Sequence, residues 1–194
     1  MKRGIIMLLA VIVAATASLA AQETADTPTT MSKKELRRTM RGYKAFYEAG
    51  HLFAFEAPMK NDITHHRYID ACDKFSFTTS QGFQVNNFFY MGFGVELDYY
   101  WRKEIQEVSV PVFLNLRVNF LNKRFSPFAD FRIGGNYGNE IGGFYIAYQL
   151  GLRYALQRNH AVFMSVENSF CIEAGWSETD NSISNLGFKI GSEF

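Results

Sequence analysis

The sequence lacks a strong charge of either sign and, after its N-terminal segment, any long hydrophobic run. Its formal net charge is +1 over 194 residues, which gives no field that would attract nucleic acid. No later stretch approaches the roughly 18 consecutive apolar residues of a transmembrane helix, so a helical span is excluded there. Aromatic residues, by contrast, are abundant: 19 Phe and 10 Tyr contribute to an aromatic fraction of 16%.

The N-terminal segment has the composition of an export signal. A basic MKR start is followed by the apolar run GIIMLLAVIVAATAS, which ends near the small-x-small pattern Ser18-Leu19-Ala20. We expect a signal peptide over residues 1–21, removed by cleavage after Ala20 or Ala21; an uncleaved helical anchor is the alternative. No cysteine follows the run, which argues against a lipid-modified N-terminus. Export would place the mature chain in an oxidising compartment.

Residues 22–41 are predicted to be a periplasmic linker with a short helix. The stretch QETADTPTTM is polar and Thr-rich and contains Pro28, as flexible linkers do. In the following SKKELRRTMR, Ser32 and Glu35 have the spacing of a helix-capping box. A basic helix could contact anionic lipid headgroups. A helix this short is unstable alone, however, which favours a solvated tether.

Beyond the linker, apolar residues alternate with polar or small ones, which is the period of a β-strand. In FFYMGFGVELDYYW, residues 88–101, one set of alternate positions is uniformly apolar, and the other contains Gly92, Gly94, Glu96 and Asp98. The mean hydropathy of −0.12 conceals this pattern, because alternating residues average out. Eight such strands are predicted, at about 42–55, 73–85, 88–101, 106–120, 125–137, 142–156, 161–173 and 183–194.

The connections between these strands alternate in length. Three are tight and contain Asn, at Asn86-Asn87, 121–124 and 157–160, and Asn tolerates the positive φ that tight hairpins need. The others are more varied, and the first and last of them span about 56–72 and 174–182. All the tight turns therefore fall at one end of an antiparallel up-and-down sheet, as the short periplasmic turns of outer-membrane barrels do.

Two prolines fall within the predicted strands. Because proline cannot donate to the hydrogen-bond ladder, Pro111 and Pro127 are each expected at a strand end, a bulge or a local irregularity. Pro111 lies in the middle of its predicted strand, so it is the residue that fits the pattern least well.

The apolar faces of the eight strands decide between two kinds of closed barrel. A soluble barrel would turn them inward, and a membrane barrel would turn them toward lipid. Eight strands enclose a lumen just wide enough for side chains, and the apolar set, dominated by Phe, Tyr, Leu and Val, is too bulky to fill it. The glycine-rich, charged set fits that space. The predicted fold class is therefore all-β: an eight-stranded antiparallel up-and-down transmembrane β-barrel over residues 42–194.

The same assignment places the strand charges in the lumen. Glu96 and Asp98 are then tolerated because Arg117 or Arg132 can pair with them, whereas unpaired carboxylates there would be costly. They could alternatively form an acid–base pair, but pairing in the lumen explains them more simply. The lumen charge network is predicted to comprise Lys44, Glu48, Glu96, Asp98, Arg117, Asp130, Arg132, Arg153, Glu167 and Lys189, and the same face carries Lys74, Glu107 and Glu193.

Four segments carry a resemblance to a known family: FTTSQGFQVNNFFYMGFGVELDYYW, VPVFLNLRVNFLNKRFSPFADFRIG, GGFYIAYQLGLRYAL and the ending LGFKIGSEF. Together they resemble the small outer-membrane β-barrel domain family of Gram-negative bacteria, with the architecture of the OmpA and OmpX barrels and a porin-like pattern. The resemblance implies an outer-membrane location and insertion by the barrel-assembly machinery, which recognises a last strand ending in an aromatic residue. Phe188, Ile190 and Phe194 resemble that signal, whereas Ser192 replaces the usual apolar residue. The family has no common catalytic residues.

Three functions are compatible with this fold. The favoured one is a structural or surface-interaction barrel with a lumen plugged by charges, and a narrow porin-like channel is the alternative. An outer-membrane lipid-modifying enzyme is least favoured, because it needs a His with Ser and an acid, and no spacing fixes such a triad. The residues available for it are His65, His66, Ser177, Glu178 and Asp180. We expect no enzyme activity, no cofactor and no nucleic-acid partner, and a monomer in contact with outer-membrane lipid.

Histidines and cysteines give two weaker signals. His65 and His66 are adjacent, with His51 near the end of the first strand, but a metal site needs three or four converging ligands, so no metal site is predicted. Cys72 opens the second strand and Cys171 closes the seventh, and by parity both face inward at the outer rim. A disulfide between them is a candidate in an oxidising compartment, and it requires Cα atoms within about 7 Å of each other.

Overall fold

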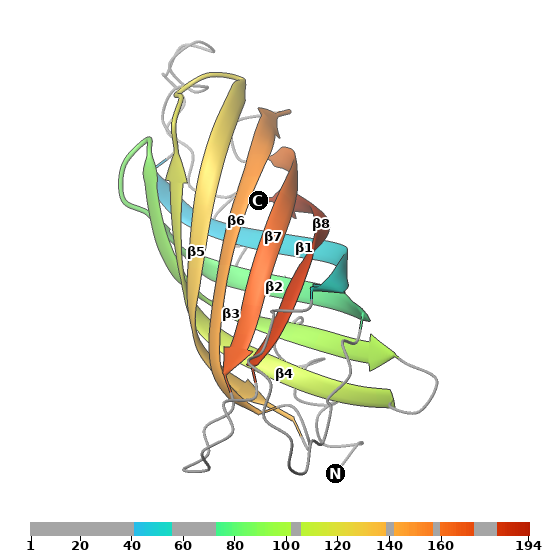
Figure 1. Cartoon of the computed structure of the whole chain (residues 1–194). Coiled ribbons are helices and arrows are strands. Elements are labelled where there is room, and N and C mark those ends of the chain that lie inside the picture. Colours follow the sequence, from blue (N-terminus) through green and yellow to red (C-terminus); the bar gives the residue numbers. More distant parts are fainter. Residues whose placement is uncertain (1–40, 56–72, 102–105, 139–141, 157–159, 173–181) are drawn as a thin grey trace, which may run out of the picture.

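The computed structural model describes residues 41–55, 73–101, 106–138, 142–156, 160–172 and 182–194. These residues form one closed antiparallel barrel, in which each strand pairs with its neighbours in sequence and the last pairs with the first (Figure 1). The strands are β1 (Gly42–Phe55), β2 (Asp73–Gln84), β3 (Phe89–Trp101), β4 (Gln106–Asn119), β5 (Phe125–Tyr137), β6 (Gly143–Ala155), β7 (Ala161–Ile172) and β8 (Ser182–Glu193). Among the described residues, no helix is long and apolar enough to cross a membrane. The predicted fold class is confirmed, and every predicted strand end lies within one residue of the observed one.

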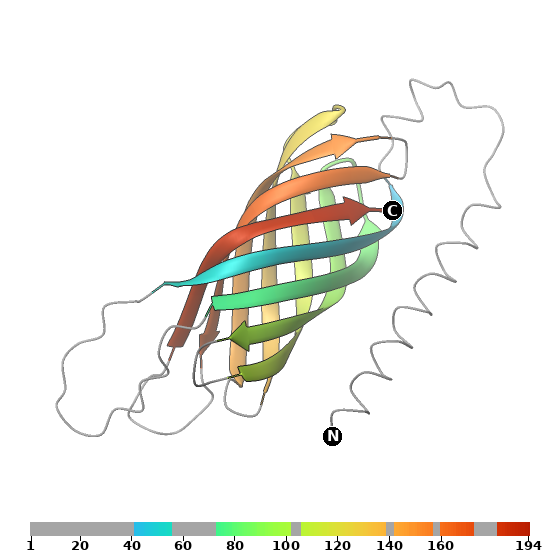
Figure 2. The same ribbon diagram turned by 90° about the vertical axis from the view of Figure 1, so that its right-hand side faces the viewer.

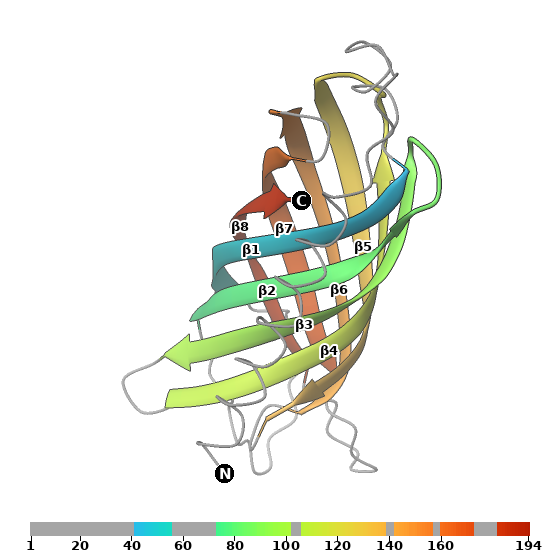
Figure 3. The same ribbon diagram turned by 180° about the vertical axis from the view of Figure 1, so that it is seen from behind.

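The two ends of the barrel differ. The turns at 85–88 and 120–124 join β2 to β3 and β4 to β5, and they lie at the same end as the start of β1 and the end of β8. In the first turn, the Asn86 side-chain oxygen accepts hydrogen bonds from the backbone N–H groups of Phe88 and Phe89, both at 2.8 Å. The asparagine therefore stabilises this hairpin through its side chain. We call this end the tight-turn end and the opposite one the loop end (Figures 2 and 3).

Side chains alternate between the outside and the lumen along the strands. The apolar set faces outward, where Phe93 is 72% exposed and Leu114 is 43% exposed. The charged set faces inward, where the side chains of Glu96, Arg117 and Arg132 have no exposed surface. This is the arrangement of a membrane barrel and the reverse of a soluble one.

Aromatic side chains gather on the outer surface near both ends. Near the loop end, the ring of Trp101 lies 5.1 Å from the ring of His51. At the tight-turn end, the ring of Phe194 lies 5.9 Å from that of Tyr47 and 5.0 Å from that of His160. Aromatic belts of this kind mark the two membrane–water interfaces of membrane barrels. The exposed apolar surface between them therefore has the form of a lipid-facing band, which we call the apolar band.

Pro111 lies within β4, which continues through it. Its side chain is buried in the lumen, and its backbone pairs with Asn136 of β5. On the other side, the pairing of β3 with β4 is interrupted at residues 96–97 and 110–111, with the same register before and after the gap. Of the three outcomes expected for this proline, a local irregularity is therefore the one observed. Pro127 lies near the start of β5.

The barrel closes between β8 and β1. The backbone N–H of Ala45 donates to the carbonyl of Phe194 at 3.0 Å, and the N–H of Phe194 donates to the carbonyl of Ala45 at 2.9 Å. Phe188 and Ile190, which belong with Phe194 to the predicted assembly signal, face outward on β8. Phe194 is therefore part of the closing seam, and its recognition by the assembly machinery stays a prediction.

Deleting Phe194 should lower the yield of folded barrel, because it removes two hydrogen bonds of the seam and the ring contact with Tyr47. Outer-membrane fractions of cells that express the truncated and the full-length chains would be compared on gels, with and without boiling, since folded barrels migrate differently from boiled ones. Phe194→Tyr, which keeps an aromatic ring, is the control. An unchanged folded yield of the truncated chain would contradict both roles of this residue.

An arginine placed in the middle of the apolar band should destabilise the barrel. Phe93 pairs with Leu114 across β3 and β4, and both side chains face outward. We expect Phe93→Arg or Leu114→Arg to lower the free energy of unfolding in lipid vesicles by about 2–4 kcal/mol, as basic residues at the bilayer midplane do. Urea titration measures this, with Phe93→Leu and Leu114→Ile as controls. A negligible loss in both arginine variants would argue for a soluble barrel.

Candidate functional site: the ion-paired lumen

Arg132 of β5 lies at the centre of the charges in the lumen. Its guanidinium contacts four carboxylates, with N–O distances between 2.7 and 3.5 Å. Because a guanidinium presents five N–H donors in one plane, one arginine can join carboxylates that no two neighbouring strands could bring together. The four carboxylates come from the alternate strands β1, β3, β5 and β7, and they are Glu48, Glu96, Asp130 and Glu167.

Arg117 of β4 joins these charges to a group of aromatic rings. Its Nε donates to Asp130 at 2.7 Å, and its Nη2 donates to Glu48 at 3.2 Å. A guanidinium over aromatic faces is attracted by the ring quadrupoles, most strongly when water is excluded. Arg117 is therefore held by carboxylates and by rings at once. Its guanidinium carbon lies 4.1, 4.4 and 4.6 Å from the ring centroids of Phe46, Phe128 and Phe163.

Two lysines supply the other positive charges that contact these carboxylates. Lys189 of β8 lies 2.7 Å from Glu96 and 2.8 Å from Glu167. Lys74 of β2 lies 2.8 Å from Asp98 and 3.4 Å from Glu96. Each lysine therefore bridges two carboxylates, and Glu96 is shared by both lysines and Arg132.

Gln149 of β6 completes a group to which every strand contributes. Its amide nitrogen donates to Glu48 at 3.1 Å and to Ser165 at 2.6 Å, and its oxygen accepts a hydrogen bond from Arg132 at 3.2 Å. The charged and amide side chains of this group cross-link all eight strands from inside. We call them the ion cluster: Glu48, Lys74, Glu96, Asp98, Arg117, Asp130, Arg132, Gln149, Glu167 and Lys189.

An aromatic layer lies next to the ion cluster, toward the tight-turn end. Phe46 meets Tyr90 and Phe163 edge-on, with ring centroids 4.8 and 6.1 Å apart. Phe128 meets Phe163 in the same way at 5.5 Å. The four rings are buried and form one contiguous cluster. They come from β1, β3, β5 and β7, so the layer spans the lumen from wall to wall.

A second, smaller ion group lies at the tight-turn end of the lumen. Glu193 of β8 accepts hydrogen bonds from Nε and Nη2 of Arg153 at 2.5 and 2.9 Å, and the Lys44 ammonium lies 2.8 Å from Glu193. Along β1, the successive inward positions are Lys44, Phe46 and Glu48. The order along the lumen is therefore the second ion group, the aromatic layer and then the ion cluster.

Glycines make room for the aromatic layer. A Cβ atom on Gly151 would lie 2.5 Å from the ring of Phe128, and one on Gly191 would overlap the ring of Phe163. Each glycine is the cross-strand partner of the residue that it accommodates. A lumen this narrow can hold large rings only where the facing residue is small, which explains why glycines share the charged face.

The structure places all ten residues of the predicted charge network in the lumen, and each is buried. The pairing expected for Glu96 and Asp98 differs from the one observed. Their nearest cations are Lys74 and Lys189, and only Glu96 reaches Arg132, at 3.5 Å. Arg117 does not pair with them, because its register partner on β3 is Tyr90, six residues nearer the tight-turn end than Glu96.

The sequence reasoning missed the aromatic layer and left Lys74 and Glu193 out of the network. A signal for the layer exists on three alternate strands, where an inward aromatic residue precedes the inward carboxylate by two or four positions. The pairs are Phe46 before Glu48, Phe128 before Asp130 and Phe163 before Glu167.

Several candidate residues lie outside the described part of the chain: Cys72, His65, His66, Ser177, Glu178 and Asp180. The disulfide between Cys72 and Cys171 and the enzyme alternative therefore stay predictions. Cys171 itself is buried, and its sulfur accepts a hydrogen bond from the Asn136 amide at 3.4 Å. Within the described ranges, no group of three or more His, Cys, Asp and Glu side chains could hold a metal ion.

Comparison with known proteins identifies the fold. No family model matches the sequence, and no curated protein matches it. Among solved structures, the Neisserial surface protein A (NspA) superposes with a TM-score of 0.61 at 10% identity, over 78% of this chain and 95% of that one. The outer membrane enzyme PagL superposes with a TM-score of 0.55 at 10% identity, over 75% of this chain and 97% of that one. The chain therefore has the fold of eight-stranded outer-membrane barrels.

Removing the Arg132 guanidinium should destabilise the barrel strongly, because Glu48, Asp130 and Glu167 would lose a shared counter-charge. We expect Arg132→Met to cost about 3–5 kcal/mol of unfolding free energy, the range for breaking a buried ion pair by removing one partner. Adding Glu48→Gln should recover part of this loss, since one carboxylate is then neutral.

Urea unfolding of the refolded variants measures these differences. The control is Met164→Leu, at an outward-facing position of β7 that is 60% exposed, which should change the stability by no more than about 0.5 kcal/mol. An equally small change for Arg132→Met would mean that the ion cluster does not hold the barrel together.

Proposed function

We propose that this chain is an integral outer-membrane barrel with a plugged lumen, and that it acts as a structural or surface-interaction protein. The observation that carries the proposal is the stacking of the aromatic layer on the ion cluster across the lumen. It is neither a channel nor an enzyme in this proposal, and it works as a monomer without a cofactor.

The plug follows from the energetics of the lumen. A permeating ion would have to displace side chains that neutralise one another in a space from which water is largely excluded, and separating buried charges costs several kcal/mol per ion. It would also have to pass the rings of Phe46, Tyr90, Phe128 and Phe163, which offer little to replace its hydration shell. Both barriers lie in series, since the aromatic layer and the ion cluster occupy successive levels of the same lumen.

The location rests on the outer surface. Large apolar side chains cover the outside of the strands, aromatic residues gather near both ends, and the fold is that of known outer-membrane barrels. In such barrels the short turns face the periplasm, so the tight-turn end is assigned to the periplasmic side. Insertion would then depend on the barrel-assembly machinery and on the seam residue Phe194. Recognition of outside partners would fall to the longest connections in the sequence, 56–72 and 173–181.

Single-channel recording of the refolded barrel in a planar bilayer tests the plug. We expect no conductance steps, because the lumen is blocked at two levels. A gel shift between unboiled and boiled samples shows that the protein is folded, and a general porin in the same bilayer shows that channels would be detected. Reproducible steps from folded protein would overturn the plug and support the narrow-channel alternative. Variants of Glu96, Asp98, Arg117 and Arg132 would then report the ion selectivity.

A further inference from the structure

Exposed cationic side chains lie at two places on the tight-turn rim, one on either side of the β2–β3 turn. Arg41 precedes β1, Lys123 and Arg124 lie in the turn between β4 and β5, and all three are exposed. The β2–β3 turn lies between them, since the N–H of Asn119 at the end of β4 donates to the carbonyl of Phe88 at 2.7 Å. We call Arg41, residues 86–88 and residues 123–124 the basic arc.

No exposed acidic side chain offsets these cations among the described residues of the tight-turn end. Glu193, the acidic residue nearest this rim, is buried and paired with Lys44 and Arg153. The charges of Lys44, Arg153 and Glu193 are therefore paired inside the barrel, while those of the basic arc face outward. An uncompensated patch of one sign attracts ligands of the other.

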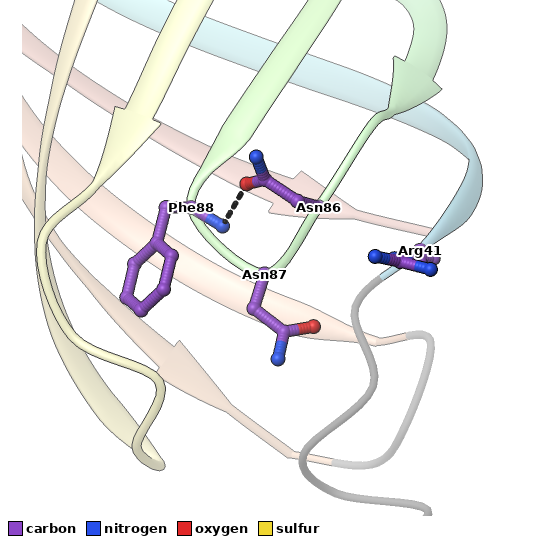
Figure 4. A pocket seen from close by; sticks show the side chains of 4 residues that line it. All are labelled: Arg41, Asn86, Asn87 and Phe88. Atoms are coloured by element: carbon purple, nitrogen blue, oxygen red, sulfur yellow. Dashed lines mark hydrogen bonds between the residues drawn. The ribbon is translucent and has the colours of Figure 1, made fainter.

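A pocket of about 540 Å³ opens between Arg41 and the β2–β3 turn. Figure 4 shows the guanidinium of Arg41 on one side of this turn and the ring of Phe88 pointing away from it, with Asn86 and Asn87 in the turn between them. The hydrogen bonds that Asn86 accepts from the backbone fix the turn in this form. The wall of the pocket therefore combines a cation with amide groups, and Phe88 lies at its edge. This chemistry suits a phosphate group that is attached to an apolar tail.

Arg124 is fixed near the edge of the apolar band. Its Nε donates to the carbonyl of Ala155 at 3.2 Å, and its guanidinium carbon lies 4.7 Å from the centroid of the Tyr154 ring. Tyr154 faces outward on β6, and tyrosines of membrane barrels gather at the level of the lipid headgroups. The guanidinium is therefore held where lipid phosphates lie, and arginine binds phosphate oxygens in a two-pronged fashion.

Exposed apolar side chains flank the basic arc on the outer surface. They belong to the ends of β2 and β5 and to the turns, and they are Phe83, Val85, Phe120, Leu121 and Phe125. A ligand at this rim thus meets cations beside an apolar surface. Free phosphate would use only the cations, whereas a phospholipid would use both.

We infer that the basic arc binds the headgroups of anionic phospholipids, with the phosphate of one lipid on Lys123 and Arg124, that of another on Arg41, and the acyl chains along the apolar band. The inference rests on the proposed membrane insertion, in which the tight-turn end meets the periplasmic leaflet. The proposed function requires only that the barrel is inserted in a lipid bilayer. The inference adds a preference for one class of lipid headgroup.

Native mass spectrometry tests this with barrels released from nanodiscs that contain equal amounts of phosphatidylglycerol and phosphatidylcholine. We expect the unmodified barrel to retain phosphatidylglycerol several-fold over phosphatidylcholine, and Lys123→Gln/Arg124→Gln to lose most of this preference. Arg41→Gln should reduce it by a smaller factor. Salt should weaken it, because the screening length falls from about 10 Å at 0.1 M to about 3 Å at 1 M.

The matched control is Arg102→Gln/Lys103→Gln, which removes one arginine and one lysine from the connection between β3 and β4 at the opposite end. It should keep the preference of the unmodified barrel. Equal retention of the two lipids by the unmodified barrel, or an equal loss in the two double variants, would overturn the inference. So would adducts of added inorganic phosphate without a lipid preference. Gel shifts establish that each variant is folded. Conductance is recorded separately, so the failure of this inference is distinguishable from the failure of the proposed plug.

Discussion

The contact of one guanidinium with four carboxylates is the interaction on which this barrel depends. The buried carboxylates of Glu48, Glu96, Asp130 and Glu167 would repel one another, and Arg132 offsets that repulsion by contacting all of them. The arrangement exists only when the barrel is closed, because the four carboxylates lie on alternate strands of the circle. Closure and charge neutralisation are therefore the same event. The contacts reach strands that lie between those of the four carboxylates through Lys74 of β2, Arg117 of β4 and Lys189 of β8.

The small lumen sets the next constraint, since eight strands leave space for side chains and little else. The charges fill one level, and the rings of Phe46, Tyr90, Phe128 and Phe163 fill the next. Large rings require small facing residues, which is the role of Gly151 and Gly191. The composition of the inward face, part charged, part aromatic and part glycine, is thus a consequence of packing in a fixed width. No separate functional demand is needed to explain it.

The sequence alone was sufficient for the strands, their order and the direction of their faces. A period of two is a local property, and a shift by one residue would turn every charge of a strand toward lipid. The ion pairs could not be predicted in the same way, because they depend on how far each strand is staggered around the barrel. Glu96 and Lys189 lie 93 residues apart in the chain and 2.7 Å apart in space. Arg117 has the charge to pair with Glu96, but register places it opposite Tyr90. The alternation along a strand indicates whether a side chain faces the lumen or the outside. Only the stagger of the strands indicates how far along the lumen that side chain lies.

The two ends of the barrel differ in the interactions that they contain. The closing seam between Ala45 and Phe194, the ion group around Glu193, the aromatic layer and the basic arc all lie toward the tight-turn end. At this end Glu193 is paired with Lys44 and Arg153 by short contacts next to the seam, so a substitution there disturbs the closure of the barrel as well as its own site. The strands are thus fixed relative to one another by the closing seam at this end and by the ion cluster further along the lumen.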